Sequence, residues 1–212
     1  MAIAMTKGYS EQTAGAKLCI DLASDWGAEC ISALDVNENV FLMDYGAADG
    51  GTASEFWEKI INQIQAKNKS SEITLIGNDL YSNDNQALIK NLSIQSKNNE
   101  LVKTLLCAGS FYDHLVPTGF IDFGFSATAM HWLNKKVESL NDHTHVLASS
   151  NQNARNDFLK QALFDWNQIL DIRSKELKIG GKLLTVNLSR DNENRYLGNN
   201  GGKTVNVHDE IH

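Results

Sequence analysis

The amino-acid sequence predicts an α/β fold in which a mostly parallel sheet is doubly wound by helices. Short apolar runs alternate along the chain with segments of helical periodicity, which is the pattern of strand–helix–strand units. The first apolar run, residues 40–43, passes into a glycine-rich turn over residues 44–52. A buried parallel strand delivers its chain to a ligand in this way. At 212 residues the chain is long enough for one such domain.

The elements around the first strand are predicted from their apolar spacing. Residues 11–34 place apolar side chains mostly four positions apart, which predicts one helix before the strand. After the glycine-rich turn, apolar side chains recur at three and four positions over residues 53–64, which predicts a second helix. The expected inward side chains of the first helix are Ala14, Leu18, Leu22, Trp26 and Ile31, and those of the second are Phe56, Trp57, Ile60, Ile61 and Ile64.

Three further short apolar runs predict strands in the middle of the chain. They cover residues 73–76, 104–108 and 121–125, and a helix with Leu88 turned inward is predicted over residues 83–96. Since each run is followed by glycine or polar residues, their carboxyl ends are expected at one edge of the sheet.

The carboxyl-terminal part is predicted to hold one long helix and one strand. Residues 155–178 are amphipathic, and Gly180 and Gly181 are expected to stop this helix. Residues 182–188 then read as a strand. Residues 191–212 are polar and rich in asparagine and glycine, so we predict a domain over residues 1–190 and an unstructured tail.

The amino-acid composition and charge argue against several classes of function. The net charge of −7 argues against a nucleic-acid partner, because the chain has no basic block to neutralise phosphates. No apolar run approaches the ~18 residues of a membrane span, and the amino terminus lacks a secretory signal, so a cytoplasmic protein is expected. The three cysteines have no C-x-x-C spacing, and His143 and His145 lack a nearby third ligand, so no metal site is expected.

The glycine-rich turn has the chemistry of a ligand site. Gly46 and Gly50 remove Cβ atoms where the backbone bends or meets a ligand. Asp44 and Asp49 would repel a pyrophosphate, so a cationic ligand such as S-adenosylmethionine fits better than a dinucleotide. The alternative is that the glycines serve only the geometry of a strand–helix junction. Asp79, at the tip of the second strand, stands where such folds bind ribose hydroxyls, with a helix-capping role as its alternative.

Four segments together resemble one family. They are Asp44–Thr52, Asn78–Asp84, Gly109–Pro117 and Ser126–Leu133, the last containing His131-Trp132-Leu133. In this order and spacing they resemble the SABATH carboxyl methyltransferases, which use S-adenosylmethionine to methylate salicylate, benzoate, jasmonate and indole-acetate. The family also includes N-methylating relatives of the caffeine pathway. The resemblance covers Tyr9 to about Arg190 and implies a Rossmann-like class I methyltransferase fold, truncated before the family's helical cap.

The resemblance also implies roles for individual residues. Gln12 and Trp132 would donate hydrogen bonds to the carboxylate of the acceptor, and Thr128 and His131 would line the pocket beside them. The alternatives are a surface position for Gln12 and a core position for Trp132. The implied cofactor-binding residues are Asp44, Gly46, Asp49, Thr52, Asp79, Leu80, Ser110 and Phe111.

The implied reaction is an in-line displacement at the sulfonium methyl group. A carboxylate acceptor is already ionised at pH 7, so positioning replaces a general base. One alternative is a protein that binds S-adenosylmethionine with little turnover, because a missing cap leaves the acceptor site open to water. A nucleotide-dependent oxidoreductase is the other. In a homodimer, the second subunit would supply the missing cap.

Overall fold

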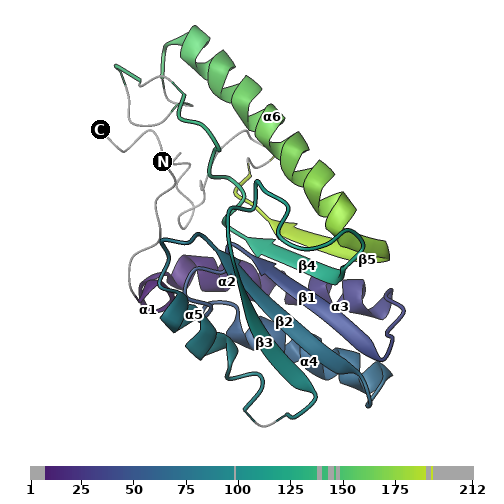
Figure 1. The fold of residues 1–212 in the computed structure, drawn as a ribbon. Coiled ribbons are helices and arrows are strands. Elements are labelled where there is room, and N and C mark those ends of the chain that lie inside the picture. Colours follow the sequence, from purple (N-terminus) through teal and green to yellow (C-terminus); the bar gives the residue numbers. More distant parts are fainter. Residues whose placement is uncertain are drawn as a thin grey trace.

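The computed structural model describes residues 8–97, 99–137, 140–142, 146, 149–189 and 192. At its centre, within these residues, lies a parallel sheet with the strand order β3-β2-β1-β4-β5 (Figure 1). The predicted parallel sheet is therefore confirmed. The strands are β1 (Asn39–Tyr45), β2 (Glu72–Asp79), β3 (Val102–Ala108), β4 (Ile121–Ala127) and β5 (Leu177–Val186).

Helices cover both faces of this sheet. Figure 1 shows α6 on one side and α2 to α5 on the opposite side. The sheet is thus doubly wound, as predicted. The helices are α1 (Tyr9–Gln12), α2 (Ala14–Leu22), α3 (Ser24–Ser32), α4 (Ser54–Lys67), α5 (Asn85–Leu92) and α6 (Gln152–Glu176).

An aromatic cluster forms the centre of the core between α4 and the sheet. The ring of Phe56 on α4 stacks on Phe125 of β4, with centroids 4.1 Å apart, and Trp57 meets the same ring edge-on. All of the side chains predicted to face inward from α4 are buried. The predicted spacing of inward side chains in α4 is therefore confirmed. This spacing places Trp57 beneath the end of β1.

The strand order brings the predicted motifs to one edge. From β1 the chain winds outward through β2 to β3 and then returns to β4 on the other side of β1. The register pairs Asp44 of β1 with Gly77 on one side and Phe125 on the other. Crossovers that diverge on either side of a strand leave a crevice at the carboxyl edge of the sheet. The glycine-rich turn follows β1 directly into that crevice.

The amino-terminal segment differs from the prediction. Residues 11–34 contain α2 and α3 with a break at Ala23, and the tip of α1 ends at Gln12. Of the five side chains predicted to face inward, Ile31 is buried as predicted. The other four are exposed, namely Ala14, Leu18, Leu22 and Trp26. For Trp26 in α3 the reason lies in its neighbour Gly27, where a Cβ would lie 2.7 Å from the Phe56 ring. Close approach of α4 to this small residue decides which face turns inward, and apolar spacing alone does not reveal it.

The junction between α6 and β5 also differs from the prediction. The helix ends at Glu176, and β5 begins at Leu177 and contains the two glycines that were expected to stop the helix. The pairing with β4 is irregular between Ile121 and Phe123, so residues 178–181 form a bulge. Gly180 has φ of 83° in that bulge. The glycines therefore serve strand geometry.

Several expectations fall outside the described residues. His143 and His145 are among these, as is the predicted tail except for Asn192. Among the residues that the structure does describe, no cluster of three metal-ligating side chains occurs. None of the described helices is both long and apolar enough to cross a membrane.

Candidate active site

A cavity of about 220 Å³ lies at the carboxyl edge of the sheet, where β1 and β4 meet. Its wall is built from the ends of four strands and the segments that follow them, together with Tyr9 of α1 and Ile20 of α2. Nine of the residues singled out from the sequence line it together. They are Asp44, Gly46, Thr52, Asp79, Leu80, Ser110, Phe111, Thr128 and Trp132.

Asp44 forms the floor of the cavity on the β1 side. Its side chain is buried, and Nε1 of Trp57 donates a hydrogen bond to its Oδ2 at 2.8 Å. Burial raises the pKa of Asp44 to about 7, although the Trp57 hydrogen bond opposes that rise. The cavity therefore holds a carboxyl group near its ionisation point. A cationic ligand would favour the charged form.

Asp79 stands at the end of β2 and holds the glycine-rich turn. Its Oδ2 accepts a hydrogen bond from the backbone N–H of Ala48 at 2.7 Å, and its Oδ1 accepts one from Leu80 at 2.7 Å. Burial raises the pKa of this carboxyl. Since each carboxylate oxygen has two lone pairs, both oxygens keep an acceptor position for a ligand hydroxyl. The predicted capping alternative does not apply, because Asp84 caps α5 instead.

The turn itself adopts a backbone that few residues tolerate. Gly46 has φ of 76° and Gly50 has φ of 73°. A Cβ on Gly46 would lie 2.4 Å from Cβ of Ala129, so the segments after β1 and β4 approach as closely as they do only because Gly46 has no side chain. Ala48 also has a positive φ of 52°. Such backbone strain gathers at functional sites.

The acceptor side of the cavity is formed by the segment after β4. Thr128 has φ of 50°, a second strained backbone position at this cavity. The Trp132 side chain is 56% exposed, which contradicts its alternative as a core aromatic. The hydroxyl of Tyr112 donates to the backbone oxygen of Trp132 at 2.8 Å and so joins this segment to the one after β3.

Three predicted residues lie outside this wall. Asp49 is buried, and its Oδ2 accepts hydrogen bonds from N–H and Oγ of Ser10, both at 2.9 Å, so it ties α1 to the turn. Gln12 is exposed on α1 and does not line the cavity. His131 lines a neighbouring cavity with Asp165. The backbone N–H of Trp132 donates to the oxygen of Ala129 at 3.2 Å in a turn, and the adjacent side chains of His131 and Trp132 line different cavities.

Sequence reasoning missed several lining residues. Tyr112 directly follows Ser110 and Phe111 in the same motif, so its position in the sequence was sufficient to predict it as a lining residue. Tyr9 and Asn134 also line the cavity but stand in no distinctive local pattern. Only the packing of α1 and of the segment after β4 brings them there.

The geometry of the cavity defines a class of protein. A doubly wound sheet with a glycine-rich, acidic cavity at the point where its crossovers diverge is typical of proteins that bind nucleoside-containing ligands. The chain belongs to the family of SAM dependent carboxyl methyltransferases, whose family model matches residues 6–207. This confirms the predicted SABATH resemblance. It also confirms S-adenosylmethionine as the cofactor of the family.

Individual relatives agree with the family. The chain is 28% identical over 179 residues to the salicylate/benzoate carboxyl methyltransferase of Arabidopsis thaliana, covering 78% of this chain and 47% of that relative. It is 26% identical over 182 residues to the probable jasmonic acid carboxyl methyltransferase 2 of Theobroma cacao, covering 76% of this chain and 49% of the relative. The chain thus spans about half the length of the curated relatives it matches.

A solved structure confirms the fold. A loganic acid methyltransferase with SAH superposes with a TM-score of 0.73 at 20% sequence identity. The match covers 96% of this chain and 60% of that one. The predicted Rossmann-like class I methyltransferase fold is therefore confirmed.

Proposed function

We propose that this chain binds S-adenosylmethionine in the cavity at the carboxyl edge of the sheet and transfers its methyl group to the carboxylate of a small organic acid. The observation that carries the proposal is that Asp44, Asp79 and Trp132 line one cavity together. When bound, the cofactor supplies an electrophilic methyl group. The surrounding residues fit it, because the carboxyl groups of Asp44 and Asp79 line the cavity and would face its cationic groups and ribose hydroxyls.

The residues on the cofactor side would bind and orient. Asp79 would accept hydrogen bonds from the two ribose hydroxyls, since both of its oxygens have a free acceptor position. Asp44 would face the cationic methionine portion together with Thr52. Leu80, Ser110 and Phe111 would enclose the adenine.

The residues on the acceptor side would aim a carboxylate. The indole N–H of Trp132 would donate to one carboxylate oxygen without neutralising it, so the oxygen stays nucleophilic. Gln12 is the proposed second donor, and Thr128 and His131 are proposed to shape the pocket. No general base is needed, since the acceptor is ionised at neutral pH. The rate would come from alignment of the acceptor oxygen with the methyl group.

A second candidate is a protein that binds S-adenosylmethionine with little turnover. Trp132 is 56% exposed, which favours this candidate, because an acceptor side that is open to solvent admits water.

An assay with a panel of methyl acceptors distinguishes the two candidates. Salicylate, benzoate, jasmonate and 7-methylxanthine are incubated with radiolabelled S-adenosylmethionine and the full chain, and methyl transfer to a carboxylic acid supports the leading proposal. Binding without transfer favours the second candidate, and transfer only to the xanthine would reassign the acceptor to nitrogen.

Asp79→Ala tests the cofactor role. We expect the dissociation constant for S-adenosylhomocysteine, measured by calorimetry, to rise at least about tenfold, because two hydrogen bonds to a charged acceptor are lost. The control is Asp35→Ala, which removes the same charge from an exposed position. Circular dichroism checks the fold of both variants. Unchanged affinity in Asp79→Ala would contradict the ribose role.

Three finer expectations remain part of the proposal. We propose a domain over residues 1–190 with residues 191–212 as a tail, which limited proteolysis tests. We also propose a homodimer, which sedimentation measures, and a cytoplasmic location without a nucleic-acid partner.

A further inference from the structure

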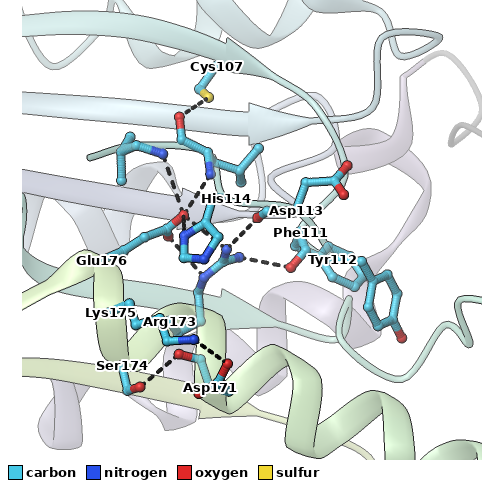
Figure 2. Close-up of polar contacts among 12 residues, drawn as sticks. Cys107, Phe111, Tyr112, Asp113, His114, Asp171, Arg173, Ser174, Lys175 and Glu176 are labelled. Carbon is cyan, nitrogen blue, oxygen red and sulfur yellow. Dashed lines mark hydrogen bonds and ion pairs between the residues drawn. The ribbon is translucent and has the colours of Figure 1, made fainter. Parts of the chain in front are cut away.

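A fully buried ion pair sits on the inner face of α6. Nε of Arg173 lies 3.0 Å from Oε2 of Glu176, and both side chains are shielded from solvent (Figure 2). Removing two charges from water is costly unless their remaining hydrogen-bonding groups are also satisfied. The partners of those groups therefore indicate what the pair does.

The partners lie on the segment between β3 and β4, residues 109–117, which contains no helix or strand. Arg173 donates from Nη1 to the backbone oxygen of Phe111 at 2.9 Å and from Nη2 to that of Asp113 at 2.7 Å. Oε1 of Glu176 accepts from the backbone N–H of Leu115 at 2.6 Å. Figure 2 shows the Arg173 guanidinium bonded to the segment at Phe111 and Asp113, with Glu176 beside it.

The pair is also fixed against the sheet. The hydroxyl of Tyr45 donates to Oε2 of Glu176 at 2.9 Å, and the Arg173 guanidinium lies 4.5 Å from the centroid of the Tyr45 ring. Tyr45 follows Asp44 directly in β1. The same pair therefore contacts the strand that carries the glycine-rich turn and the segment that faces that turn across the cavity.

The segment held in this way forms one wall of the cavity. Ser110, Phe111 and Tyr112 line it, and Tyr112 is bonded through its hydroxyl to the backbone of Trp132. We infer that Arg173 and Glu176 are positioning residues, which set the distance between this wall and the glycine-rich turn and so determine cofactor affinity. The inference rests on the proposed function, since it concerns the same cavity.

The test removes both charges at once. The variant Arg173→Met/Glu176→Leu keeps side-chain volume and leaves no unpaired buried charge, so it avoids the main cause of misfolding. The matched control is Lys175→Met/Asp171→Leu, which removes an exposed ion pair of 2.6 Å from the same helix. Figure 2 shows both pairs. Two quantities are measured on the full chain, namely amide hydrogen exchange of residues 109–116 and the dissociation constant for S-adenosylhomocysteine.

In the double variant we expect both quantities to rise at least about tenfold, because several charge-assisted hydrogen bonds are lost. The control should leave both within about twofold of the parent chain, since exposed ion pairs contribute little. Gln168→Leu is a milder second variant, which removes only the contact from Nε2 to the backbone oxygen of Tyr112 at 3.1 Å. It should change both quantities in the same direction without touching the buried pair.

Two results would overturn the inference. If exchange of the segment does not change in the double variant, the pair does not hold it. If exchange rises but the affinity for S-adenosylhomocysteine is unaltered, the role is purely structural. A parent chain that fails to bind S-adenosylhomocysteine is a different result, because it refutes the proposed function while the exchange data still decide whether the pair holds the segment.

Discussion

At the scale of single residues, the site is defined by carboxyl groups that are kept out of water. Asp44 is buried with one side-chain donor, Trp57, at 2.8 Å. Its pKa of about 7 lies well above the value of about 3.9 that aspartate has in an unfolded chain. The folded protein therefore holds an extra proton between these two values. Such a group stabilises the fold at low pH and loses that contribution as pH rises.

This gives a prediction for Asp44→Asn. In the parent chain, the Asp44 contribution to the free energy of unfolding is complete below about pH 4 and is lost as pH rises to about 7, with a steepest slope of roughly 1.4 kcal/mol per pH unit. The asparagine variant lacks this titration. The difference in unfolding free energy between the two proteins, from urea denaturation at several pH values, should shift in favour of the variant toward pH 7. A difference that is constant over this range would contradict the burial of an ionisable Asp44.

At the scale of elements, α6 has an unusual distribution of side chains. Of the apolar residues that make this segment amphipathic, Leu159, Leu163 and Leu170 are exposed, and Ile169 is buried. Arg173 and Glu176 are buried on the same helix. The buried face is used for hydrogen bonds to the segment after β3. Amphipathic periodicity predicted the helix correctly but only part of its buried face, because buried charges on that face do not follow the rule that apolar residues point inward.

The bulge that follows α6 leads to a prediction for Gly181→Ala. A Cβ at this position would meet the backbone oxygens of Lys178, Ile121 and Asp122 at 2.9, 3.0 and 3.2 Å. Backbone atoms cannot avoid the added Cβ by rotating about a side-chain bond, so we expect the free energy of unfolding to fall by about 1–3 kcal/mol. Urea denaturation measures it.

The matched control for this prediction is Gly15→Ala in α2. A Cβ there has no neighbour within 4 Å, and alanine is the better helix former. We expect Gly15→Ala to be neutral or to stabilise by up to about 1 kcal/mol. Equal effects of the two substitutions would show that crowding in the bulge does not govern the junction of α6 and β5.

At the scale of the whole molecule, ligand binding should raise the stability of the chain by mass action. With S-adenosylhomocysteine at a hundred times its dissociation constant, the gain is about 2.7 kcal/mol, or roughly 5–10 °C in melting temperature for a domain of this size. NAD at equal concentration should produce no shift, since the acidic turn disfavours its pyrophosphate. Thermal denaturation with each ligand measures both. A shift with NAD alone would favour the oxidoreductase alternative.

The sequence by itself determined the class of fold and most of one site. Strand runs, the glycine-rich turn and the acid at the tip of β2 are local patterns, and parallel pairing brings every strand's carboxyl end to the same edge. For this reason Asp44, Asp79, Ser110 and Trp132 could be expected at one cavity before the topology was known.

Only the tertiary structure decided what depends on contacts between distant parts of the chain. Arg173 and Phe111 are 62 residues apart in sequence, and their hydrogen bond forms because α6 packs across the face of the sheet beside the segment after β3. The same is true of Asp49, which was predicted to bind the cofactor but lies against Ser10, 39 residues away. The local sequence pattern around a side chain indicates which helix or strand the side chain belongs to. Its interaction partner depends on how whole helices and strands pack together, and no local pattern contains that information.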